Sequence, residues 1–151
     1  MRIPVLTFLL GLLASMLGAA PAFATTLITT AEAALPPPAA APLSMRGITL
    51  GPSVMLISPA ADAGAKSPLE FKVKFVPHNQ AMVDPSSVKV TYVKSTPVDL
   101  TARLKPFTSA DGIDMTNAEV PPGVHVLRID LKDSNGKTAT SFLKLTVTGG
   151  K

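Results

Sequence analysis

The chain has 151 residues, within the usual range of a single domain, and contains no cysteine, which excludes disulfides and thiolate metal sites. Its formal net charge is +4, from 14 Lys and Arg against 10 Asp and Glu, and the basic residues form no run. Because the chain has one Tyr and no Trp, it offers little for bases to stack on, and nucleic-acid binding is not expected.

The first residues have the pattern of a signal peptide. Arg2 gives a positive start, residues 5–17 form an apolar run, and Ala22 and Ala24 place small residues at both positions that a signal peptidase reads. Residues 1–24 are therefore predicted to direct export, to the periplasm or outside the cell, with cleavage after Ala24. The alternative is a retained membrane anchor, although the apolar run is short against the roughly 20 residues that a span needs.

Residues 25–47 are rich in Ala, Pro and Thr, with three consecutive prolines at 36–38. Such a composition favours extended polyproline II geometry and cannot form a packed core by itself. We therefore predict a disordered Ala/Pro-rich linker here, which is either a working spacer or a poorly constrained tail.

From residue 48 onward, short β-rich runs alternate with turns made of Pro, Gly, Asp, Asn and Ser. Residues 69–75 alternate strictly between apolar and charged side chains, which predicts a strand with one buried face. Further strands are predicted at residues 54–57, 88–93, 113–115, 124–131 and 139–147, and residues 98–104 are either a strand or a helical turn capped by Asp99. Asn135-Gly136 predicts a hairpin between the last two strands. Six or seven short strands predict an all-β fold, a single antiparallel immunoglobulin-like β-sandwich over residues 48–151.

The chain contains only two histidines, and one of them falls in this final hairpin. His125 has the same parity as Leu127 and Ile129. Arg128 and Asp130 share the opposite parity, so they are predicted to face water. His125 should therefore point inward, with a ring nitrogen bonded to nearby backbone.

The segment from Val120 to Leu127 resembles the start of strand F in bacterial immunoglobulin-like domains. In that pattern a Gly-x-Tyr-x-Cys or Gly-x-Tyr-x-Leu stretch places a corner tyrosine two residues before a core position. Gly123 matches the glycine, His125 takes the tyrosine place and Leu127 the core place. The resemblance implies that these three residues form a structural corner.

A narrower pattern resembles periplasmic copper carriers of the CopC type. It consists of Ser58-Pro59-Ala60 with a later Ala63, then Pro68 with an apolar strand, then the Pro-x-Gly stretch before His125. The resemblance implies a copper-binding carrier. In that family the ligands include a histidine at the mature N-terminus and a later Asp-Gly-His. Thr25 and the segment Asp133-Ser134-Asn135-Gly136 stand in those places in this chain.

Candidate chemistry is sparse. His78 and Met82 share a loop and carry the imidazole and thioether that suit copper, but they have no paired-ligand spacing, so loop packing is the alternative. No nucleophile motif is present, and we expect neither enzymatic activity nor a cofactor. Lys72, Lys74, Lys89, Arg128 and Lys132 would form a basic sheet face if their strands were neighbours. The sequence thus predicts a non-enzymatic binding or structural module of the bacterial cell envelope whose partner is an envelope protein or polymer.

Overall fold

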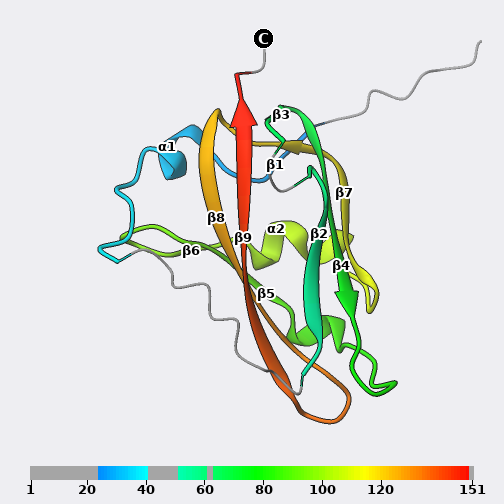
Figure 1. The fold of residues 1–151 in the computed structure, drawn as a ribbon. Helices are drawn as coiled ribbons and strands as arrows, with labels where there is room; N and C mark the ends of the chain where they lie inside the picture. Colours follow the sequence, from blue (N-terminus) through cyan, green and yellow to red (C-terminus); the bar gives the residue numbers. More distant parts are fainter. Residues whose placement is uncertain (1–23, 41–50, 61–62, 150–151) are drawn as a thin grey trace, which may run out of the picture.

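The computed structural model describes residues 24–40, 51–60 and 63–149, which form two β-sheets around one core (Figure 1). The four-stranded sheet has the order β1 (Thr25–Thr26), β7 (Gly112–Glu119), β4 (Leu69–Val76), β2 (Ser53–Ser58). The five-stranded sheet has the order β3 (Ala65–Lys66), β9 (Thr138–Thr148), β8 (Gly123–Lys132), β5 (Lys89–Tyr92), β6 (Val98–Asp99). The helices are α1 (Thr30–Ala33), η1 (Pro85–Ser87), α2 (Thr101–Leu104) and η2 (Lys105–Phe107). Among the described residues, no helix is long and apolar enough to cross a membrane.

The predicted all-β character is confirmed, and each predicted strand corresponds to one of the six longer strands. The sheets are mixed rather than purely antiparallel, because the two-residue strands β1 and β3 run parallel to β7 and β9. Residues 98–104, for which the sequence left strand and helical turn open, contain one of each, because the short strand β6 is followed by the helix α2. The Asp99 carboxylate accepts the N–H of Thr101 at 2.8 Å, which satisfies one free donor at the start of α2.

The core forms where the inward faces of the two sheets meet. β4 buries Leu69, Phe71, Val73 and Phe75 on one face, as its alternation predicts. Leu127 and Ile129 of β8 belong to the same apolar cluster from the other sheet. Removing this apolar area from water is the main force that holds the layers together.

The β8–β9 hairpin is the longest ladder of the molecule. Its register runs from Gly123 opposite Val147 to Lys132 opposite Thr138. Gly136 lies in the turn with φ of +79°, a conformation in which glycine is favoured. The turn at Asp133 and Gly136 is therefore formed where the Asn-Gly signal predicts it.

The prediction of a disordered linker is wrong for the part that the structure describes. Residues 25–36, here called the N-terminal strap, pack against the domain, and Leu27 and Ile28 are almost fully buried. Thr29 and Glu32 form a reciprocal capping box that starts α1. Ordering these residues costs conformational entropy, and the Ala/Pro composition predicts that this cost keeps them disordered. The burial of two aliphatic side chains and the capped helical turn offset the cost.

Three predicted features lie wholly or partly outside the described residues. These are residues 1–23 of the signal peptide, including Ala22, residues 41–47 of the linker, and residues 48–50 at the start of the predicted domain. Ala24 is described and half-buried, one residue before β1.

Candidate functional site

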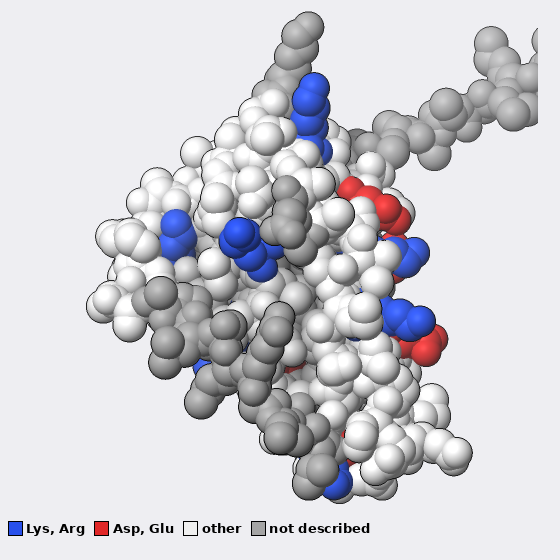
Figure 2. All heavy atoms as spheres, viewed as in Figure 1, with Lys and Arg blue, Asp and Glu red and all other residues white. Residues whose placement is uncertain are grey.

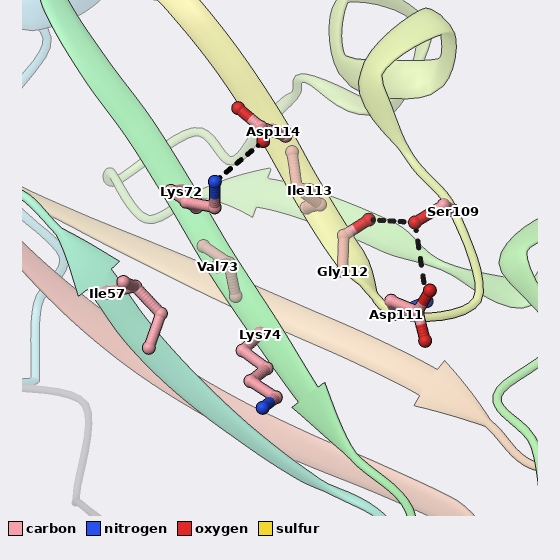
Figure 3. A pocket seen from close by; sticks show the side chains of 9 residues that line it. All are labelled: Ile57, Lys72, Val73, Lys74, Ser109, Asp111, Gly112, Ile113 and Asp114. Atoms are coloured by element: carbon pink, nitrogen blue, oxygen red, sulfur yellow. Dashed lines mark hydrogen bonds and ion pairs between the residues drawn. The ribbon is translucent and has the colours of Figure 1, made fainter.

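An open groove of about 430 Å³ lies on the four-stranded sheet, where β2, β4 and β7 run side by side (Figure 3). Ile57 of β2 lines one side of it, and Lys72 and Lys74 of β4 lie beside it. Asp114 of β7 and Asp111 of the preceding loop supply carboxylates. The groove therefore combines an apolar wall with charges of both signs.

One of the two lysines is already paired. Lys72 Nζ lies 2.9 Å from Asp114 Oδ2, and these residues occupy directly opposed positions of the antiparallel β4–β7 ladder. The hydrogen bond to Asp114 and then its negative charge raise the pKa of Lys72. Lys74 has no ion-pair partner among the described residues. Lys74 and Asp111 are thus the two charges of the groove that have no ion pair among the described residues, and Lys74 is the positive one.

The floor of the groove depends on a close approach of two backbones. Gly112 begins β7 opposite Lys74, and a Cβ built on Gly112 would lie 2.0 Å from the carbonyl oxygen of Val73. The Ser109 hydroxyl donates to the Gly112 carbonyl at 3.2 Å and accepts from the N–H of Asp111 at 3.3 Å. These bonds hold the loop carrying Asp111 against the end of β7.

An apolar edge strand borders the groove. β2 carries no charged residue, and its Met55 and Ile57 side chains are 52% and 46% exposed. A β-bulge falls between Leu56 and Ser58, and this irregularity re-aims the local side chains. The other edge strands of the two sheets, β1, β3 and β6, have two residues each. Within the described chain, β2 is therefore one edge available for pairing with another strand, and residues 138–146 of β9, which β3 leaves uncovered, are another.

The predicted single basic face is wrong. Lys72 and Lys74 lie on β4 of the four-stranded sheet, whereas Lys89, Arg128 and Lys132 lie on β5 and β8 of the five-stranded sheet. Basic and acidic side chains instead lie next to each other along the side formed by β4 and β7 (Figure 2). On β8, Arg128 is paired with Asp130 at 2.9 Å. Sequence alternation assigns a residue to a face of its own strand, but strand pairing decides which faces are joined.

His125 occupies the predicted inward position and is only 2% exposed. Its Nε2 lies 2.8 Å from the Pro121 carbonyl oxygen, and its Nδ1 lies 2.8 Å from the Tyr92 hydroxyl. Burial is the main cause that lowers the pKa of His125, and the positive charge of Lys94 adds to it. Both ring nitrogens have partners and Leu127 is fully buried, so His125 and Leu127 are packed in the core, whereas Gly123 is exposed.

His78 and Met82 lie in the loop between β4 and η1, and both are exposed. The described residues contain no group of three His, Cys, Asp or Glu side chains placed to hold a metal ion. The two histidines are not brought together, since His125 is enclosed by Tyr92 and Pro121. The sequence did not predict the groove. The signal that pointed to it was the alternation of β4, which places Lys72 and Lys74 on the face away from the core.

The geometry defines a class of protein, an all-β chain with two sheets on one core and an open groove beside an apolar edge strand. Comparisons of this chain with protein-family models, with curated proteins and with solved structures found no match.

Proposed function

We propose that this chain is an exported immunoglobulin-like module of the cell envelope, without enzymatic activity, that binds an extended segment of another envelope protein along β2. The strand order supports the immunoglobulin-like part of the proposal. If β2, β4 and β7 are taken as strands A, B and E, and β5, β8 and β9 as C, F and G, their division into two sheets follows the immunoglobulin arrangement. The export pattern of residues 1–24 supports the location.

The observation that carries the binding proposal is the uncharged, exposed edge of β2 beside the groove. Strand addition uses the free backbone N–H and C=O groups of an edge and gains specificity from alternate side chains. Met55 and Ile57 offer apolar contacts to such a strand, while Lys74 offers a positive charge. The proposed partner segment is therefore extended, apolar at alternate positions, and carries a carboxylate that reaches Lys74.

The chemistry of the groove favours binding over catalysis. Its lining holds ammonium groups, carboxylates and a hydroxyl, but neither histidine. The Ser109 hydroxyl is engaged with the backbone of its own loop. A nucleophile needs a base within hydrogen-bond reach, and none of the groove contacts places one beside Ser109.

Photo-crosslinking in the cells that express the full chain tests the proposal. A photoreactive amino acid at Met55 is expected to give a protein adduct, and the same group at Val124, on β8 and 60% exposed, is the matched control. Ile57→Lys and Lys74→Glu should each reduce the Met55 adduct at least about fivefold, whereas Val124→Lys should leave it unchanged. No adduct specific to Met55 would overturn the proposal. So would an adduct made of polysaccharide or of a second copy of this chain.

A further inference from the structure

A buried histidine is linked to the N-terminal strap through two side chains. Lys94 Nζ donates to the carbonyl oxygens of Ala33 at 2.8 Å and Leu35 at 3.0 Å, which lie at the end of α1 and just beyond it. The same ammonium lies 5.2 Å from the centroid of the Tyr92 ring. The Tyr92 hydroxyl is bonded to His125 Nδ1, so the imidazole and the strap share one continuous set of contacts.

The bonding pattern fixes the proton of the neutral imidazole. The Pro121 carbonyl can only accept, so Nε2 carries the hydrogen and Nδ1 accepts from the Tyr92 hydroxyl. A second proton must go onto Nδ1, where it would reverse the bond with Tyr92 and place a positive charge in the core. The Tyr92 hydroxyl would then need a new acceptor.

The charges that face this group come from the strap, from α2 and from the segment after β5. Lys94 is the cation whose charge acts on His125, and Glu32 acts on Tyr92 from α1. Arg103 of α2 neutralises Glu32 through two hydrogen bonds. Leu145 of β9, directly opposite His125, carries no charge. A charged His125 would therefore act mainly on Lys94, and like charges repel more strongly where burial lowers the local dielectric.

We propose that protonation of His125 in mild acid releases Lys94 from the Ala33 and Leu35 carbonyls and frees the C-terminal end of the strap, residues 33–36, which follows the Glu32 contact with Arg103. The β1 end stays in place, because Leu27 and Ile28 remain buried. The Arg103–Glu32 pair also holds, since the pKa of Glu32 is lowered to about 2 and its carboxylate stays ionised throughout this range. The strap is thus a pH-sensitive latch with one fixed end and one releasable end.

Amide exchange measured by NMR on the whole mature chain tests this inference. The amides of Ala34, Leu35 and Ser95 are bonded to Thr30, Glu32 and Pro36, so they report the releasable end. Their protection factors should fall about tenfold between pH 7.5 and pH 5. The midpoint of this fall should coincide with the midpoint of the His125 ring titration. The protection factors of Leu27 and Ile28, whose amides donate to Glu119, should not change. Equal protection at both pH values in the Ala34 to Ser95 set would overturn the inference.

A Lys94→Met variant keeps the test decisive even if substitution of His125 prevents folding. Protection at Leu35 should then be low at both pH values, and the His125 titration midpoint should rise, because the coupling between two groups is reciprocal. Lys89→Met, on the exposed face of β5, is the matched control and should reproduce the wild-type behaviour. An unchanged His125 midpoint in Lys94→Met would contradict the proposed link.

Discussion

The guanidinium of Arg103 holds both carboxylate oxygens of Glu32, with Nη2–Oε1 at 2.7 Å and Nη1–Oε2 at 2.9 Å. Nη1 also donates to the Leu27 carbonyl at 2.8 Å, so one side chain joins α2 to both parts of the strap. Such two-point pairs are stronger than single bonds and fix the relative orientation of their elements. The strap is therefore an integral part of the fold.

Removing the Arg103 guanidinium should destabilise the domain. Arg103→Met leaves the half-buried Glu32 carboxylate and the Leu27 carbonyl without their partner, and we expect the free energy of unfolding to fall by about 2 kcal/mol. Urea unfolding at pH 7 measures this loss. Arg128→Met is the control, because the Arg128–Asp130 pair is more exposed and should contribute less than about 1 kcal/mol.

The Arg103–Glu32 pair predicts that the stability of the domain falls over a defined acidic pH range. The hydrogen bond from Arg103 is the main cause that lowers the pKa of Glu32 from 4.5 to about 2. Its contribution is therefore complete above pH 4.5 and is lost as the pH falls toward 2. Melting temperatures of wild type and Glu32→Gln, measured from pH 7 to pH 2, should converge in that window. A constant difference down to pH 2 would show that the carboxylate charge is not what stabilises the strap.

His125 should give a separate loss of stability at milder pH. Burial lowers its pKa in the folded chain below the ordinary 6.5, so the unfolded state takes up the proton first. The contribution is complete above pH 6.5 and is lost as the pH falls from there toward the lowered value in the folded chain. We expect unfolding midpoints in urea to decrease between pH 7 and pH 5, whereas a His125→Gln variant, although less stable, should show a flatter profile.

Truncation of Leu27 should open a cavity under the strap. Leu27→Ala removes a fully buried side chain, and comparable substitutions cost about 2–5 kcal/mol. Thr25→Ala, two residues earlier and exposed, is the control and should change stability by less than about 0.5 kcal/mol. Thermal unfolding followed by circular dichroism distinguishes these results. Equal effects of the two substitutions would mean that the strap does not contribute to the core.

A methyl group at Gly112 should disturb the floor of the groove. The added Cβ would meet the Val73 carbonyl at 2.0 Å, so β7 and β4 must separate, at a cost of about 2 kcal/mol or more. Gly149→Ala is the matched control, because a Cβ there meets nothing within 4 Å. Denaturant unfolding and the crosslinking yield at Met55 should both fall in Gly112→Ala only.

The amino-acid sequence determined the features that rest on local periodicity. Strict alternation in residues 69–75 predicts which β4 side chains are buried, and the same parity predicts the inward position of His125. Asp133 and Asn135-Gly136 predict the hairpin turn. The Asp133 carboxylate accepts the N–H of Asn135, and Gly136 adopts a positive φ. Periodicity and turn chemistry act over a few residues, so a single chain is enough to reveal them.

Tertiary structure alone decided which of these elements meet. The strap looks like a linker by composition, and only the contacts with β7, Arg103 and Lys94, far away in the sequence, give it an ordered place. The lysines of β4 and β8 share a parity but not a sheet, and the groove arises because β2, β4 and β7 become neighbours. Such features depend on long-range pairing, whose free energy comes from partners that local sequence does not specify.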